Sequence, residues 1–129
     1  MKPEIKQKWT EALRSGKYAQ GKHQLYDGAN YCCLGVLCEL YLEGTGETWV
    51  PLNEDTPISD GYYIDGESEI LPGIVGEWAG VDGGINGSGL EVVIPLPESA
   101  QTLKVGVISL NDDLDYTFPQ IADLIEAQL

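Results

Sequence analysis

The most apolar segment of the chain is YCCLGVLCELYLE, at residues 31–43. Ten of its thirteen residues are apolar, so helical spacing leaves it almost no polar face. A helix that is apolar nearly all round is typical of the centre of a domain. We therefore predict a buried helix over residues 31–43, with Asn30 as its N-cap and Gly44 as its end. Gly35 costs up to ~1 kcal/mol relative to Ala inside a helix, which predicts a close approach by another element.

The sequence before this segment predicts an amphipathic helix over residues 3–15. Its apolar positions, Ile5, Trp9 and Leu13, recur at helical spacing. Glycines interrupt residues 17–30, which we interpret as a loop.

After the buried helix, residues 44–70 are acidic and rich in turn-forming residues. We expect short strands at 48–52 and 62–64. A short helix is expected over residues 71–79, with three side chains facing inward: Ile74, Val75 and Trp78.

Residues 80–89 are rich in glycine and predict a loop, either a mobile one or one that closes on a ligand. Residues 90–96 and 103–110 are rich in Val, Ile and Leu, and a hairpin is the simplest arrangement for them. Thr117 and Gln120 have the spacing of a capping box and predict the start of the last helix.

These elements predict an α+β fold. We expect a single domain over residues 1–129, with two N-terminal helices (the second buried), a small antiparallel β-rich middle and a C-terminal helix. The length fits one domain.

The charge is unevenly distributed. Residues 1–22 hold six of the seven basic residues and two of the 21 acidic ones, a net charge of +4. Residues 23–129 hold one base and nineteen acids, a net charge of −18. General nucleic-acid binding is not expected, because phosphate contacts need Lys and Arg. The basic segment either lies against the acidic body or faces an anion or an acidic partner.

The three cysteines, Cys32, Cys33 and Cys38, lie within the buried helix and show no Cys-x-x-Cys spacing. An odd, crowded set of this kind predicts free thiols in a reducing compartment, and we expect a cytoplasmic protein with no membrane-spanning segment. Cys32 or Cys33 could act as a nucleophile with the single histidine, His23, but burial as small hydrophobic residues is the favoured interpretation.

The candidate binding site lies in RSGKYAQGK, at residues 14–22, which combines cations, a ring and an amide. Arg and Tyr can bind a nucleotide through a phosphate contact and a stacked ring. The alternative is that these cations only stabilise the C-terminal end of the first helix. The candidate ligand-binding residues are Arg14, Lys17, Tyr18, Gln20 and Lys22.

No cofactor or metal is expected. Asn111, Asp113 and Asp115 alternate like the start of a calcium loop, but the loop would need Gly and Glu where Tyr116 and Ala122 stand. We interpret this stretch as a solvated turn before the last helix. The glycine-rich segment at 80–89 contains no lysine and is not a P-loop.

Three blocks of the sequence resemble an uncharacterised family of small accessory proteins that are common in tailed-phage and prophage genomes. The blocks are Trp9-x-x-Ala12-Leu13-Arg14-Ser15-Gly16-x-Tyr18-x-Gln20-Gly21, then Tyr31-Cys32-Cys33-Leu34-Gly35-Val36-Leu37-Cys38, then Leu110-Asn111-Asp112 with Thr117-Phe118-x-x-Ile121-Ala122-Asp123-Leu124-Ile125-Glu126. The resemblance implies a phage protein that works in the cytoplasm of an infected bacterium. It names no catalytic residue.

Our leading hypothesis is a non-enzymatic binding protein that antagonises host defence by sequestering a small anionic, nucleotide-like signal. Its pocket would lie between the first two helices, closed by the glycine-rich loop. The alternatives are an acidic protein–protein inhibitor of a host factor, which could imitate the charge of DNA, and a Cys–His hydrolase. A homo-oligomer is possible.

Overall fold

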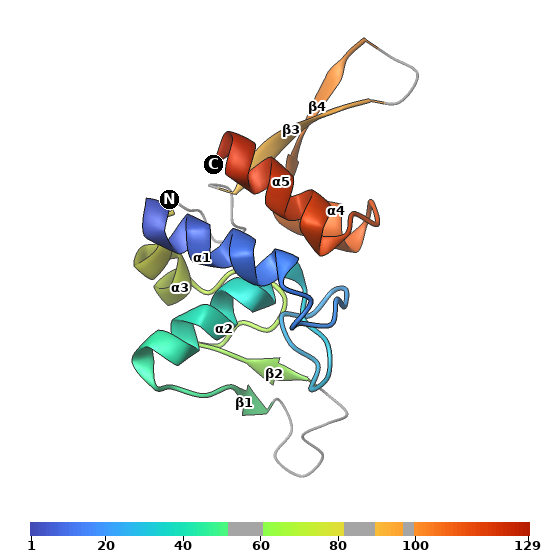
Figure 1. Cartoon of the computed structure of the whole chain (residues 1–129). Helices are drawn as coiled ribbons and strands as arrows, with labels where there is room; N and C mark the ends of the chain where they lie inside the picture. Colours follow the sequence, from blue (N-terminus) through green and yellow to red (C-terminus); the bar gives the residue numbers. More distant parts are fainter. Residues whose placement is uncertain (52–60, 82–89, 97–99) are drawn as a thin grey trace.

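The structure, a computed structural model, describes residues 1–51, 61–81, 90–96 and 100–129 (Figure 1). It confirms the α+β class: helices stand at both ends of the chain, and two small antiparallel sheets lie between them in the sequence. The predicted single domain over 1–129 remains a prediction. The glycine-rich segment falls almost wholly outside the described residues, since 82–89 are not among them.

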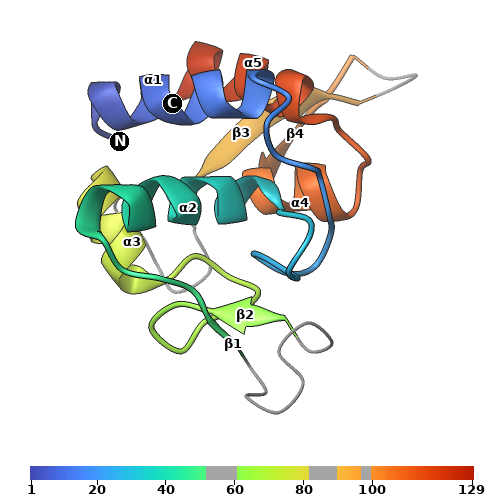
Figure 2. The ribbon, with the colours of Figure 1, turned by 60° about the horizontal axis from the view of Figure 1, so that its bottom comes forward.

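The first and last helices lie side by side. Helix α1 spans Pro3–Arg14 and helix α5 spans Phe118–Gln128, and Figure 2 shows them side by side above α2. Trp9 of α1 is fully buried, and its Nε1 donates a hydrogen bond of 2.9 Å to the carbonyl of Cys33. This bond fixes α1 against the start of the second helix. The capping box of Thr117 and Gln120 is present, as predicted.

Helix α2 spans Cys33–Thr45 and lies at the centre of the molecule, as expected. Both of its predicted ends were wrong. The N-cap is Cys32 rather than Asn30, and the helix passes through Gly44 to end at Gly46, whose φ of 77° is left-handed. Gly46 suits that end better because a left-handed residue is the usual helix stop, whereas Gly44 has helical backbone.

The close approach predicted at Gly35 is present. A Cβ built on Gly35 would lie 1.7 Å from the carbonyl oxygen of Leu25, in the loop that precedes α2. That loop also donates from the Leu25 N–H to the carbonyl of Ser68, at 2.8 Å. The backbone around Leu25 therefore lies directly on α2.

The short helix α3, Gly73–Ala79, begins after Pro72, as predicted. Of its three expected inward side chains, Val75 is buried and Trp78 is partly buried against the edge of Tyr41. The prediction for Ile74 was wrong, since it is 39% exposed. A helix of seven residues gives one narrow buried stripe, and Val75 and Ala79, one turn apart, occupy it.

Two hairpins make up the strands. Strand β1 (Val50–Pro51) pairs with β2 (Tyr62–Tyr63), and β3 (Glu91–Pro95) pairs with β4 (Thr102–Gly106) in antiparallel register. The β3–β4 hairpin projects from the body in Figure 1.

The strand predicted over 103–110 was wrong beyond Gly106. The chain turns there into helix α4, Val107–Asp112. Helical spacing buries Val107, Leu110 and Asn111 on one side, which an extended strand could not do because it alternates its faces.

The outer edge of β3 is occupied by a side chain. The Val93 N–H donates to Gln128 Oε1 at 2.7 Å, and Gln128 Nε2 donates to the Val93 carbonyl at 2.8 Å. The amide of Gln128 thus makes with Val93 the two hydrogen bonds that a neighbouring strand would make.

Candidate functional site

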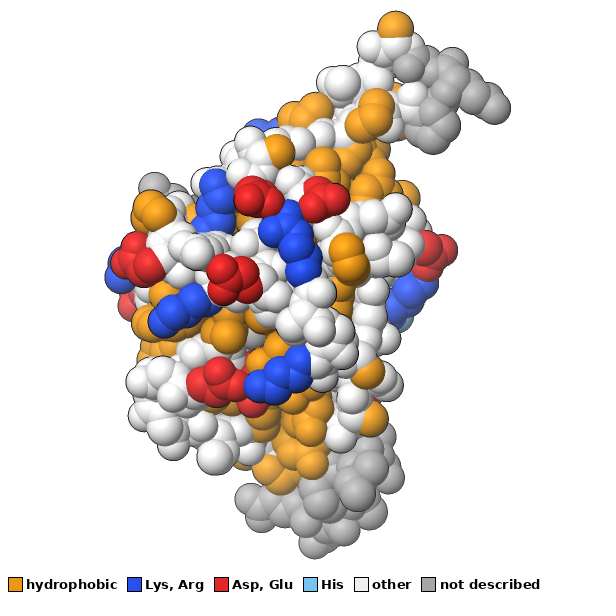
Figure 3. Space-filling view, viewed as in Figure 1, with side chains coloured by type: hydrophobic (Ala, Val, Ile, Leu, Met, Phe, Trp, Pro, Cys, Tyr) orange, Lys and Arg blue, Asp and Glu red, His pale blue; other side chains and the backbone are white. Residues whose placement is uncertain are grey.

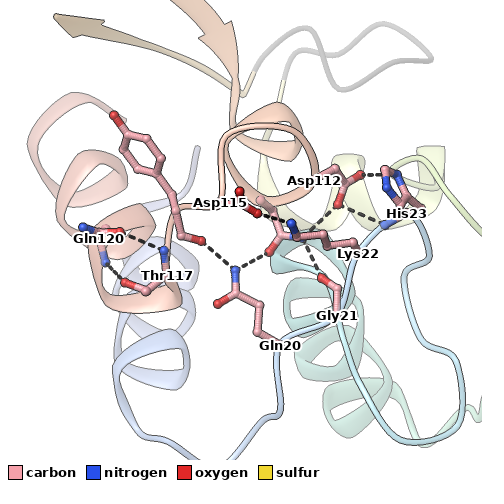
Figure 4. A network of polar contacts seen from close by, with 10 residues as sticks. Gln20, Gly21, Lys22, His23, Asp112, Asp115, Thr117 and Gln120 are labelled. Carbon is pink, nitrogen blue, oxygen red and sulfur yellow. Dashed lines mark hydrogen bonds and ion pairs between the residues drawn. The ribbon is translucent and has the colours of Figure 1, made fainter. Parts of the chain in front are cut away.

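The predicted binding segment leaves the C-terminal end of α1 and crosses α5 and α4. Gly16 has a left-handed φ of 74°, which turns the chain away from the helix axis. Beyond this turn, the loop is joined by hydrogen bonds and ion pairs to residues 111–118 (Figure 4). The segment is therefore held in place by the other end of the chain.

Arg14 is paired with two carboxylates of α5. Its Nη2 lies 2.8 Å from Asp123 Oδ1 and 2.5 Å from Glu126 Oε2. Hydrogen bonds from Arg14 to these carboxylates raise its pKa, so it stays charged. Among the described residues, Nε and Nη1 of Arg14 make no hydrogen bond, and two nitrogens of the guanidinium remain for another acceptor.

Gln20 joins the loop to α4 and α5. Its Nε2 donates to Asn111 Oδ1 at 2.9 Å and to the Tyr116 carbonyl at 2.7 Å, and its Oε1 accepts from the Phe118 N–H at 3.2 Å. Asn111 is fully buried and donates to the Gly21 carbonyl at 2.8 Å. The expectation of a solvated turn is therefore wrong at Asn111. Its side-chain oxygen and nitrogen instead form hydrogen bonds with Gln20 and Gly21 of the loop.

Two further residues of the loop, Lys22 and His23, face acids at the end of α4 and just after it. Lys22 forms an ion pair with Asp115. The backbone N–H of His23 donates to Asp112 Oδ1 at 3.0 Å, and its ring nitrogen Nδ1 lies 3.9 Å from Asp112 Oδ2. Figure 4 shows both side chains pointing toward these carboxylates.

Three of the five predicted site residues meet at one surface hollow, which we call the junction hollow. It lies between the end of α1 and the first turn of α5, not between the first two helices as predicted, and it has a volume of about 230 Å³. Its lining includes Arg14, Tyr18, Gln20, Thr117, Phe118 and Pro119. Lys22 instead lines a neighbouring hollow of about 230 Å³ with Gln20 and Asp115.

The glycine-rich segment begins at the far end of α1 from this hollow. A Cβ on Gly80 would lie 2.9 Å from the side chain of Lys2, and the Lys2 N–H donates to the carbonyl of Ala79 at 2.8 Å. The twelve residues of α1 separate that end from Arg14, about 17 Å at 1.5 Å per residue. The rest of the segment lies outside the described residues.

The fifth predicted residue, Lys17, and the ring of Tyr18 border a surface that sequence reasoning missed. Five half-buried rings make mutual contacts there, with centroids 4.5 to 6.4 Å apart. They come from the loop before α2, from the chain after it and from β2. We call this surface the aromatic face: Tyr18, Tyr26, Tyr31, Trp49 and Tyr62. Figure 3 shows hydrophobic side chains gathered over this part of the molecule, in the lower half of the view.

Carboxylates lie close to these rings. Trp49 Nε1 donates to Glu39 Oε2 at 2.6 Å, and Lys17 Nζ lies 3.9 Å from Glu43 Oε1. Burial, followed by the charges of Glu43 and Glu39, raises the pKa of Tyr18. Burial, followed by the charge of Glu39, also raises the pKa of Tyr31. Tyr18 and Tyr31 therefore remain neutral at physiological pH.

The cysteines do not form a nucleophilic site. All three are buried and free of disulfides. Burial raises the pKa of Cys32 to about 12, and burial also raises the pKa of Cys33 and of Cys38. Cys33 Sγ donates to the carbonyl of Val107 at 3.5 Å, whereas the ring of His23 faces Asp112. This arrangement favours the structural interpretation, because a thiol reacts as its thiolate.

Within the described ranges, no group of three or more His, Cys, Asp or Glu residues could hold a metal ion. None of the described helices has the length and apolar character needed to cross a membrane.

The fold and surface define a small α+β protein with a buried helix at its centre, surface hollows beside residues 14–22 and an aromatic face. The chain belongs to the family described as a domain of unknown function, DUF8296, whose family model matches residues 1–129. No match was found among curated proteins or among solved structures.

Proposed function

We propose that this protein is a phage-encoded, non-enzymatic binding protein that antagonises host defence by capturing a small anionic, nucleotide-like ligand in the junction hollow. The phage origin and the action in the cytoplasm of an infected bacterium rest on the resemblance of the three sequence blocks. The observation that supports the ligand class is the meeting of Arg14, Tyr18 and Gln20 at one hollow.

The chemistry of the hollow suits a phosphate beside a ring. Arg14 can present its free Nε and Nη1 donors to phosphate oxygens while Nη2 remains bonded to Asp123 and Glu126 of α5. The first turn of α5 adds the positive end of a helix. Tyr18 supplies an apolar ring surface for a base. Gln20 keeps the loop in place, because its amide is held by Asn111, Tyr116 and Phe118.

The volume limits the size of the ligand. A hollow of about 230 Å³ is smaller than typical pockets for drug-sized ligands, which begin at about 300 Å³. It could hold a phosphate and part of a nucleoside, with the remainder in solvent. We therefore expect modest affinity for mononucleotides.

The test is direct titration of a nucleotide panel, linear and cyclic, into the purified protein by calorimetry. Arg14→Gln should weaken binding by about ten- to a hundredfold, since a charge-assisted contact contributes about 1.5–3 kcal/mol. Lys8→Gln, which removes the same charge from an exposed position of α1, should change the affinity less than about twofold.

The ligand should be recovered intact after heat denaturation, as mass spectrometry would show. A cleaved product would identify an enzyme instead. If no nucleotide binds, or if Arg14→Gln and Lys8→Gln behave alike, the proposed site is wrong.

A further inference from the structure

The aromatic face combines two features that attract cations. The face of an aromatic ring carries negative electrostatic potential, and a cation within about 6 Å of the ring centroid is stabilised by it. Glu39 and Glu43 lie one turn apart on α2 and therefore project to the same side of the helix. Glu39 accepts a hydrogen bond from Trp49, a ring of this face.

Lys17 shows which chemistry this surface accepts. Its ammonium lies 5.4 Å from the centroid of the Tyr18 ring and 3.9 Å from Glu43 Oε1. Its side chain is 69% exposed, so the contact is easily exchanged. The chain thus places a cation at the edge of the aromatic face, between a ring and a carboxylate.

We propose that the aromatic face binds an arginine-bearing segment of a partner protein. A guanidinium is planar, so it can lie against the exposed parts of these half-buried rings while its donors reach a carboxylate in bidentate geometry. An ammonium is a compact point charge, so it makes only the kind of contact that Lys17 already makes with Tyr18 and Glu43. Glu39 and Glu43 would accept the guanidinium where they would repel a phosphate.

A protein is the occupant that the composition of the surface favours. Tyr and Trp are enriched at the centres of protein–protein interfaces, where they provide large rigid contact areas. The net charge of −14 would also attract a basic segment from a distance and speed its association. The aromatic face shares Tyr18 with the junction hollow, but this inference rests on Trp49 and the carboxylates of α2 and concerns a partner of opposite charge.

The probe is a fluorescein-labelled peptide of four Gly-Arg repeats, titrated with the protein and followed by fluorescence anisotropy. Four Gly-Lys repeats carry the same charge, and four Gly-citrulline repeats keep the shape without the charge. We expect the arginine peptide to bind most tightly, the lysine peptide about tenfold more weakly and the citrulline peptide not measurably. Equal binding of the arginine and lysine peptides would overturn the proposal, because only net charge would then be recognised.

Two pairs of variants locate the surface. Glu39→Gln with Glu43→Gln should weaken binding of the arginine peptide about tenfold, while the glutamine at position 39 still accepts from Trp49. Glu4→Gln with Asp113→Asn removes the same charge from exposed positions and should change binding less than about twofold.

Trp49→Leu should also weaken binding about tenfold, whereas Trp78→Leu, at the other half-buried tryptophan, should not. Circular dichroism would confirm that each variant is folded. Equal effects of the two charge pairs, or of the two tryptophan variants, would overturn the proposal. Self-association that Trp49→Leu abolishes would overturn it as well, because a second copy would then cover the face.

Discussion

At Gly35, the loop around Leu25 packs on α2 because glycine has no side chain. The carbonyl of Leu25 occupies the place where a Cβ would be, and Leu25 is itself fully buried. The loop that carries the predicted binding segment can therefore lie on α2 only because residue 35 is glycine. Sequence reasoning could predict this close approach, since glycine destabilises a helix interior and is favoured there mainly where another element needs the space. It could not identify which element that would be.

Gly35→Ala should destabilise the protein by about 3 kcal/mol or more, because relieving the clash requires movement of backbone rather than of a flexible side chain. Gly44→Ala is the matched control in the same helix. A Cβ there meets nothing within 4 Å, so this change should stabilise by up to about 1 kcal/mol. Urea unfolding of both variants measures the two effects. A loss below about 1 kcal/mol at Gly35 would show that the loop moves freely away from α2.

Asn111 shows what residue-level reasoning missed. Its sequence neighbours Asp113 and Asp115 are exposed, and the alternation of polar residues suggested a turn in solvent. The residue is buried because Gln20 and Gly21, about ninety positions earlier, supply its hydrogen-bond partners. Such a partnership depends on tertiary contacts and leaves no local pattern. The sequence holds one indication of this partnership: Gln20 and Asn111 both belong to the blocks that carry the family resemblance.

Among the elements, α5 was the most predictable, because its signals are local. The Thr117 N–H donates to Gln120 Oε1 at 2.9 Å, and the Gln120 N–H donates to Thr117 Oγ1 at 3.4 Å. The two bonds satisfy two donors that an isolated helix start would leave unpaired.

Thr117→Ala should cost about 1 kcal/mol in the free energy of unfolding. Thr117→Ser keeps the hydroxyl and should lie within about 0.5 kcal/mol of the parent protein. Adding Gln120→Ala to Thr117→Ala should cost less than the sum of the two single changes, since both belong to one box. Thermal and urea unfolding of these variants provide the measurement. Equal stability of the Ala and Ser variants would mean that the capping bond contributes nothing.

The elements that were mispredicted have weak or ambiguous local signals. Residues 107–110 are Val-Ile-Ser-Leu, which favour a strand by composition, yet they form the start of α4. Short apolar runs do not distinguish a strand from a buried helix, so tertiary burial decides. The ends of α2 were missed for a related reason: two glycines stand near its C-terminus, and which of them is left-handed depends on the chain that follows.

At the scale of the whole molecule, the cysteines report on the integrity of the core. Each is buried against neighbours from several elements, so a reagent reaches them only after a large opening of the structure. Burial also raises their pKa values, which keeps the thiols protonated and unreactive at neutral pH.

A colorimetric disulfide reagent at about pH 8, just below the pKa of an exposed thiol, should therefore detect essentially no thiol in the native protein and three in urea. The rate in the native state should follow the free energy of unfolding when Gly35→Ala or Thr117→Ala is introduced. One rapidly labelled thiol in the native protein would contradict the burial of the cysteines and would restore the Cys–His hydrolase as a hypothesis.

The two-stranded hairpin of β3 and β4 has no further strand beside it, which leaves backbone groups at its outer edges. Unpaired edges of this kind are the sites at which chains join into cross-β aggregates. At Val93 the amide of Gln128 already makes both main-chain hydrogen bonds that an incoming strand would need. The last turn of α5 therefore protects a small acidic protein against assembling with its own copies through β3.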